Sequence, residues 1–311
     1  MVKRIVFWVL VLAVAGGAHA QMWMGEYSSA WSDDRNWLGG EPTFGGKSVL
    51  VGKVTDPNRH EPVITEFGEL TSGRFFLNGR LFIESGDLTC FSRFYIGYAR
   101  SGPGELTMTG GKLNIIGDTP DPSRLSIGDE SPGTVNLYDG EINIETHIAW
   151  PDGSAPGLLN LYGGVISTDG IGWKDRPGWG MVFHSSAKYP HGGKLILNGD
   201  KTQPQECDNV CGSMEKRYQI GGITTTVPGD VVRIAYYEDL DVTIIESIPR
   251  EQLPTPCGLD PDGSVDWHDI EVFAENWLRP GGDNPADFDG HAGVNLRDFA
   301  ILAAQWQKSC P

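Results

Sequence analysis

Two stretches of the chain share one pattern: residues 104–115 read GELTMTGGKLNI and residues 133–144 read GTVNLYDGEINI. In both, glycine stands at the first and eighth positions, and apolar residues stand at the third, fifth and tenth. The pattern recurs at residues 79–90 (GRLFIESGDLTC) and 157–168 (GLLNLYGGVIST). A third short apolar piece follows each unit, reading FYIG, LSIG, HIAW and GIGW in chain order. Alternating apolar and polar residues indicate strands with one buried face.

The spacing of these units predicts a coil. Their starts are 25, 29 and 24 residues apart (104−79, 133−104 and 157−133). Three short strands in each period predict an all-β body built as a parallel β-helix, in which each rung buries its apolar face only by stacking on its neighbours. A meander of hairpins is the alternative, but every unit repeats the same strands in the same order. Cys90 aligns with Ile115, Ile144 and Thr168, so we expect a core residue there and not a catalytic thiol.

The N-terminal residues are typical of an export signal. Lys3 and Arg4 precede an apolar run at 5–15, and the sequence AHA follows at 18–20. This order predicts a signal peptide at 1–20 and a secreted or cell-surface protein. A membrane anchor is the alternative, but the apolar run is short for a span, and we expect no membrane insertion after cleavage.

The charge narrows the range of partners. The formal net charge of −17 argues against nucleic acid, whose phosphates require Lys and Arg, and it suits bound cations. Export also permits disulfides, and two pairs are expected, Cys207 with Cys211 and Cys257 with Cys310.

Residues 21–250 are expected to form the β-helix domain, with a tryptophan-rich N-terminal cap at 22–37. The tryptophans of this opening, the repeated rungs and the late GGKLILNGD at 192–200 resemble the autotransporter-type β-helix of secreted bacterial proteins. The resemblance implies a fold and says little about activity.

A second duplication follows a proline-bearing linker at 251–256. DPDGSVDWHDIEVFAENWL begins at Asp260, and DGHAGVNLRDFAILAAQW begins at Asp289. Asp269 and Asp298 correspond, 29 residues apart (298−269). Each copy places apolar residues on one helical face, which predicts a small helix pair at 257–311.

This duplicated loop and helix resembles the type I dockerin module, in which each loop follows part of an EF-hand. The resemblance implies bound calcium, a cohesin-like scaffold protein as partner, and ligands at these positions: Asp260, Asp262, Ser264, Asp266 and Asp269 in the first loop, and Asp287, Asp289, Gly293, Asn295 and Asp298 in the second. Three departures matter. Gly258 supplies no opening carboxylate, Ala292 replaces a turn glycine, and His291 replaces an oxygen ligand, so we expect its side chain to turn outward. The alternative is a helix pair held by its apolar core, with solvated acidic loops.

The same resemblance places partner recognition beside the loops, at Trp267 and His268 in the first copy and at Leu296 and Arg297 in the second. A large aromatic anchor carries much of the energy of an interface, so Trp267 is expected to dominate. The alternative is that Trp267 covers the module's own small core.

The loops after each third strand are expected to gather at one corner of the coil. They carry aromatic and charged residues suited to a sugar chain: Trp150, Asp152, Trp173, Asp175, Arg176 and Trp179. Tyr138 and Tyr162 are expected on adjacent rungs, either as a saccharide surface or as a simple side-chain ladder. The sequence contains no HExxH, GxSxG or phosphate-loop motif, so no catalytic residue is assigned.

These observations favour an exported, non-catalytic β-helix that is docked to a scaffold through a calcium-binding module, with polysaccharide binding as a further expected role. The alternative is a polysaccharide-degrading hydrolase or lyase delivered by the same module, in which a carboxylate pair cleaves the sugar chain.

Overall fold

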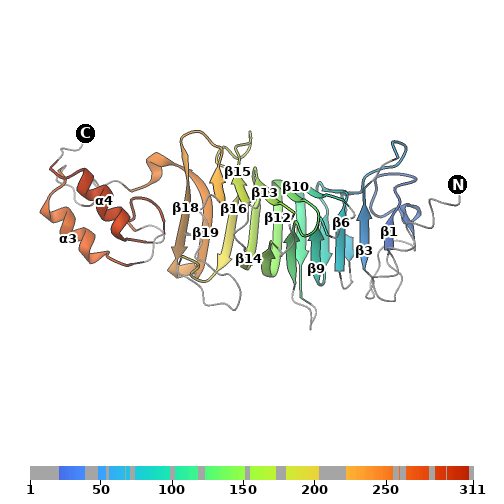
Figure 1. Ribbon diagram of the computed structural model, residues 1–311, viewed down its shortest axis with the longest axis horizontal. Helices are drawn as coiled ribbons and strands as arrows, with labels where there is room; N and C mark the ends of the chain where they lie inside the picture. The colour runs from blue at the N-terminus through green and yellow to red at the C-terminus, as the bar shows by residue number, and fades with distance from the viewer. Residues whose placement is uncertain are drawn as a thin grey trace.

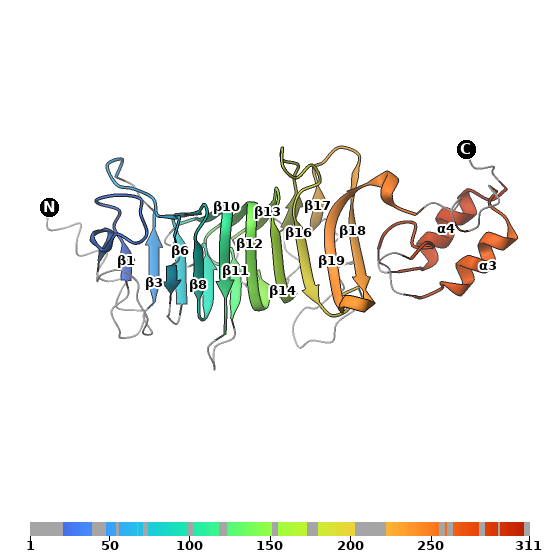
Figure 2. The same cartoon turned by 180° about the vertical axis from the view of Figure 1, so that it is seen from behind.

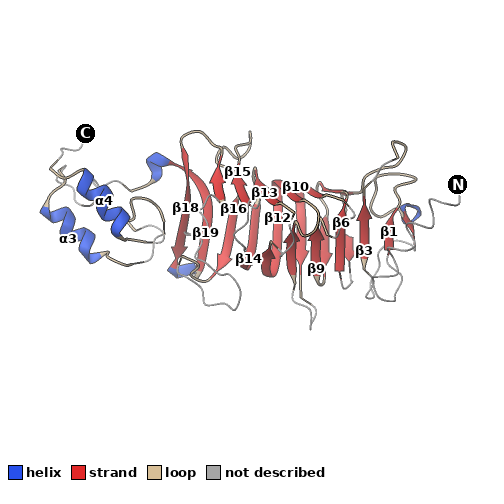
Figure 3. Ribbon diagram, in the orientation of Figure 1, coloured by secondary structure: helices blue, strands red, loops and turns tan. Residues whose placement is uncertain are grey.

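The computed structural model describes residues 21–38, 48–53, 56–66, 68–70 (backbone only), 74–98, 102–117, 123–150, 155–172, 180–202, 222–254, 259, 264–279, 284–291 and 293–307. The expected signal peptide and both expected cysteine pairs lie outside these residues. The described chain forms a rod of strands with two helices at its C-terminal end (Figure 1; Figure 2 shows the reverse side). Strands make up the body, both α-helices lie in the last segment, and short 3-10 helices lie toward the two ends of the body (Figure 3).

The body is a parallel β-solenoid of about six turns, as the repeats predict. Its strands form three stacks. The first contains β4 (Val63–Ile64), β7 (Arg80–Ile83), β10 (Gly104–Ile115), β12 (Gly133–Ala149), β13 (Gly157–Leu161), β15 (Gly180–Phe183) and β17 (Ile223–Thr225). The second contains β5 (Gly68–Leu70), β8 (Asp87–Cys90), the later parts of β10 and β12, β14 (Val165–Gly172) and β16 (Lys194–Asn198). The third contains β1 (Gln21–Trp23), β3 (Val49–Gly52), β6 (Arg74–Asn78), β9 (Arg93–Ile96), β11 (Arg124–Ile127) and the ends of β12 and β14.

The register confirms most of the repeat alignment. Gly104, Gly133 and Gly157 are paired in line across successive rungs. Leu106, Val135 and other inward residues of the first stack are fully buried, because every second side chain of a strand faces the same side. Cys90 pairs with Ile115 in the second stack and is 1% exposed. Burial raises the pKa of its thiol to about 12, so Cys90 is an inert core residue as expected.

One rung differs from the sequence alignment by a single residue. Leu125 pairs with Ile148 and not with His147. The alignment of LSIG with HIAW is therefore one residue out of register. A one-residue slip exchanges the inward and outward faces of a strand. Trp150 therefore falls in line with inward Ile127, is 1% exposed, and donates its indole N–H to the Gly157 carbonyl at 3.0 Å. The expectation that Trp150 offers a ring face to a saccharide is wrong.

Aromatic side chains close the N-terminal end of the coil. Trp23, Trp31 and Trp37 are each 5% exposed, and the Trp31 ring stacks on Phe75 at 6.1 Å between centroids. Phe75 in turn stacks on Phe94 of the next rung at 4.2 Å. The short 3-10 helix η1 (Asp34–Asn36) and β2 (Trp37–Leu38), antiparallel to β1, complete this cap. The tryptophans thus continue the internal aromatic column and cover its open end.

The C-terminal end is closed by antiparallel strands. β16 pairs with β19 (Val242–Pro249), which pairs with β18 (Asp230–Tyr237), and the 3-10 helix η3 (Glu238–Leu240) joins them. Glu246 of β19 is 5% exposed and forms ion pairs with Lys194 and Arg233. Burial raises the pKa of Glu246, but the hydrogen bonds and charges of the two cations outweigh burial and hold it below its usual value.

The two helices, α3 (Trp267–Glu275) and α4 (Leu296–Ala304), enclose a small core of Val265, Phe273, Ala286, Phe288, Val294 and Leu302. The 3-10 helix η4 (Arg250–Gln252) leads from β19 toward them. Among the described residues, no helix is long and apolar enough to cross a membrane.

The two copies of the module exchange equivalent hydrogen bonds. The Leu278 N–H donates to the Val294 carbonyl and the Gln307 N–H donates to the Val265 carbonyl, both at 2.9 Å. Each pair is related by the offset found in the sequence (307−278 and 294−265 are both 29). The end of each helix is therefore hydrogen-bonded to the loop of the other copy. The duplication is thus present in the structure as well as in the sequence.

Candidate metal centre

Three carboxylates converge where the second acidic loop enters α4. Asp287 and Asp289 lie in the loop and Asp298 lies in the first turn of the helix, and their ligand oxygens fall within 4.8 Å of one another. Asp298 is fully buried, Asp287 is 2% exposed, and the side chain of Asp289 is 17% exposed. The cluster can hold a metal ion.

Local hydrogen bonds fix these side chains. Asp298 accepts from the backbone N–H groups of Asn295 and Asp289 at 3.0 and 3.1 Å. Asn295 is the N-cap of α4, and its side-chain oxygen accepts from the Arg297 N–H at 2.9 Å. The N–H of His291 lies 3.0 Å from a carboxylate oxygen of both Asp287 and Asp289. The capping box thus orients the helix carboxylate, and one loop amide orients the other two.

The electrostatics of the cluster favour a cation. Burial, and then the neighbouring charges of Asp298 and Asp289, raise the pKa of Asp287 to about 7. Burial and the charge of Asp289 raise the pKa of Asp298 to about 6. The Asp287 Oδ2 atom is buried and accepts no hydrogen bond from the described residues. An ion with oxygen ligands would satisfy this atom and offset the repulsion among the three carboxylates.

The remaining residues expected in the second loop are arranged differently. Asn295 donates its side-chain amide to the Gly293 carbonyl at 2.7 Å, so these two expected ligands bond to each other. His291 is only 5% exposed, and the expectation that it turns outward is wrong. Its backbone is bridged to Ile234 of the solenoid, and its ring lies 3.7 Å from a carboxylate oxygen of Asp289. Ala292 lies outside the described residues.

The first loop is described at Leu259 and from Ser264 onward, and Gly258, Asp260 and Asp262 lie outside the described residues. Asp266 is the N-cap of α3 and accepts from the His268 N–H at 2.8 Å. Asp269, fully buried, accepts from the Asp266 N–H at 2.8 Å. Asp269 therefore occupies the place that Asp298 occupies in the second copy. The capping roles of Asp266 and Asn295 were missed at the sequence level, although an acidic or amide residue three positions before Asp is a recognisable capping signal.

The expected partner-binding residues lie on the surface of the module. Trp267 is 73% exposed and Leu296 is 72% exposed, and their neighbours His268 and Arg297 are also exposed. The Trp267 ring makes an edge contact with Trp306 at 5.3 Å between centroids, but it lies outside the buried core of the module. Each pair lies in the first turn of its helix, directly after the capping residue.

Of the corner-loop residues expected to bind a saccharide, the structure describes only Trp150. Trp150 is buried, and Asp152, Trp173, Asp175, Arg176 and Trp179 lie outside the described residues. Those positions remain predictions from the sequence.

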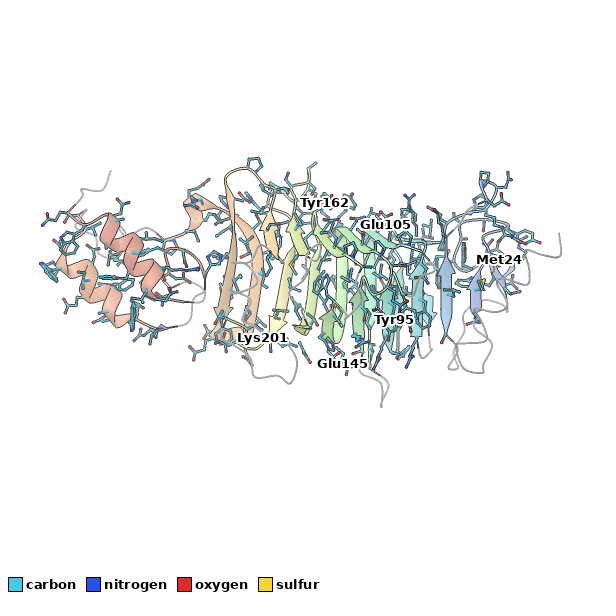
Figure 4. The ribbon with its side chains drawn as sticks, viewed as in Figure 1. Met24, Tyr95, Glu105, Glu145, Tyr162 and Lys201 are labelled. Atoms are coloured by element: carbon cyan, nitrogen blue, oxygen red, sulfur yellow. The ribbon has the colours of Figure 1, made fainter. Side chains whose placement is uncertain are left out.

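The tyrosine pair forms a ladder along the solenoid. Tyr138 and Tyr162 stack at 4.3 Å, and His184 continues the column on the other face of Tyr162 at 4.4 Å. An amide ladder runs beside it, in which Asn160 donates to Asn136 and Asn136 donates to Glu105. Tyr162 and Glu105 lie along the same edge of the rod, opposite Tyr95 and Glu145 (Figure 4). The three rings thus form a side-chain ladder along successive rungs, and saccharide binding by the tyrosines remains a prediction from the sequence.

No protein-family model matches the chain, and no match was found among curated proteins or among solved structures. The functional assignment therefore depends on the geometry above.

Proposed function

We propose that the protein is an exported, non-catalytic solenoid that attaches to a scaffold through a calcium-binding C-terminal module. The observation that carries the proposal is the cluster of Asp287, Asp289 and Asp298, in which a buried carboxylate oxygen accepts no hydrogen bond from the described part of the chain. Calcium fits this cluster because it is a hard cation that prefers several carboxylate and carbonyl oxygens in a flexible arrangement. The export signal expected at 1–20 agrees with such an extracellular calcium site.

Bound calcium would supply charge neutralisation at the start of α4. Asp298 lies in the first turn of that helix and holds the backbone of its N-cap residue. Leu296 and Arg297 follow the N-cap directly, so the ion would fix the turn that presents them. The same relation holds in the first copy between Asp269, the Asp266 backbone and exposed Trp267.

The docking surface of this proposal is formed by the two helix starts. Large apolar side chains are exposed at the same position of both copies, and in this proposal they supply the apolar contacts to the partner. The resemblance to dockerins suggests a cohesin-like scaffold protein as the partner. Trp267 is the anchor, because aromatic side chains contribute most strongly to such interfaces.

The test is capture of the partner from the secreted fraction, in calcium and in chelator, with wild-type protein and with Trp267→Ala. Leu240→Ala is the matched control, because Leu240 is 69% exposed but lies on the solenoid, in η3. We expect one partner that is retained only in calcium, kept by Leu240→Ala and lost by Trp267→Ala. Capture at unchanged affinity by a folded, calcium-loaded Trp267→Ala variant would contradict the docking assignment.

A further inference from the structure

Among the described residues, one peptide group of the second acidic loop is hydrogen-bonded to the solenoid. The Ile234 N–H of β18 donates to the Gly290 carbonyl at 3.0 Å, and Ile234 and His291 form a parallel bridge. β18 is the outermost strand of the antiparallel pair that ends the solenoid. Figure 1 shows the module at this end of the rod. The loop therefore supplies an additional backbone partner to a strand edge.

The same peptide group is also hydrogen-bonded to two carboxylates of the cluster. The carbonyl of Gly290 and the N–H of His291 belong to one planar unit. The carbonyl faces the solenoid, and the N–H lies 3.0 Å from oxygens of both Asp287 and Asp289. A shift of either carboxylate would therefore move the peptide group whose carbonyl accepts the hydrogen bond from Ile234.

The fit at this contact is close. Gly290 has a φ of +70°, and a Cβ atom added there would lie 2.7 Å from a side-chain carbon of Leu253, the residue that follows η4. The side chain of Arg233 lies next, at 3.5 Å. The positive φ favours glycine at this position, and a Cβ atom would also require the end of the Leu253 side chain to shift.

The same contact offers a reason for the unusual residue of the loop. The counterpart of His291 in the first copy is Asp262 (291−29), an oxygen ligand in the family pattern. In the second copy this position is nearly buried and its backbone is bridged to β18. In the sequence, His291 looks like a weakened metal ligand. In the structure, it lies where the loop contacts the solenoid.

We infer that the second loop is a metal-responsive end cap of the solenoid. Cation binding by Asp287, Asp289 and Asp298 fixes the peptide between Gly290 and His291 and thereby holds it on the edge of β18. Because coupling is reciprocal, the docked solenoid also raises the affinity of the loop for the ion. This inference rests on the proposed metal binding, and it adds that the module is not an independent unit on a linker.

The test is amide hydrogen exchange at Ile234 in the full chain, measured with calcium and with chelator, beside calorimetry of calcium binding. Calcium is expected to slow exchange at Ile234 about tenfold while Leu137, in the middle of the solenoid, is unchanged. Asp289→Asn should remove the calcium effect, and Asp239→Asn, which removes an exposed carboxylate from η3, should retain it.

A second pair of variants tests the contact itself. Gly290→Ala and Gly229→Ala both place alanine at positive φ, but a Cβ atom at Gly229 meets nothing within 4 Å. Gly290→Ala should weaken calcium binding and reduce the protection of Ile234, whereas Gly229→Ala should leave both unchanged. Calcium that binds normally without any effect on Ile234 overturns the inference and leaves the proposed function intact. Absence of calcium binding in calorimetry overturns both.

Discussion

Individual side chains in the coil take their roles from the direction in which they point. Trp150 illustrates this, because the same residue is a core filler in one register and a surface ring in a register one residue away. In the structure it is inward, buried, and hydrogen-bonded through its indole to the Gly157 carbonyl. A tryptophan beside a loop is thus no sign of a sugar site until its register is known.

Trp150→Ala should lower the free energy of unfolding by about 3–5 kcal/mol, the range for loss of a large buried aromatic side chain. Trp150→Phe keeps most of the buried volume and should lose less. Urea unfolding of the full chain measures both variants. A loss of less than about 1 kcal/mol for the alanine variant would show that the side chain is not in the core.

Glu246 has a depressed pKa in the folded chain, so its ion pairs stabilise the protein above the ordinary carboxyl pKa and lose this effect as the pH falls through the folded pKa. Glu246→Gln should therefore lower the unfolding free energy at neutral pH by about 1.5–3 kcal/mol, the range for hydrogen bonds to charged groups. The difference from wild type should shrink in acid. Glu238→Gln, an exposed carboxylate of η3, is the control and should change little at any pH. A deficit for Glu246→Gln that does not depend on pH would contradict the ion-pair account.

At the scale of elements, the repeat predicted the strands well because stacking reinforces the local pattern. Gly104, Gly133 and Gly157 lie in register, and Cys90 is on the line of Ile115 as expected. The prediction failed at the third strand, where the HIAW segment has no glycine to anchor its alignment. The burial of His291 was also unpredictable from local sequence, because it depends on contact with β18, more than 50 residues earlier (291−234).

The N-cap of α4 gives a test at the same scale. Asn295→Ala removes the side-chain oxygen that accepts from the Arg297 N–H and should destabilise the module by about 1 kcal/mol. Asn295→Asp retains a capping oxygen but loses the amide that donates to the Gly293 carbonyl, so it should be destabilised as well, through a different bond. Both are compared by thermal unfolding in chelator, so that a lost calcium ligand does not enter the result. Equal unfolding of all three proteins would argue against the cap.

On the scale of the whole molecule, the chain is a rod whose two ends are closed by different means. Tryptophans cover the N-terminal end, whereas antiparallel strands and the acidic loop cover the C-terminal end. The proposed docking surface lies on the helices beyond that second end, where Trp267 and Leu296 are exposed.

The central claim is that Asp287, Asp289 and Asp298 bind calcium, and calorimetric titration of the metal-stripped full chain tests it most directly. We predict that calcium binding by wild type is reproduced by Asp239→Asn, whereas Asp289→Asn loses one equivalent while remaining folded. Identical titrations of wild type and Asp289→Asn, or no heat of binding from either, would contradict the account.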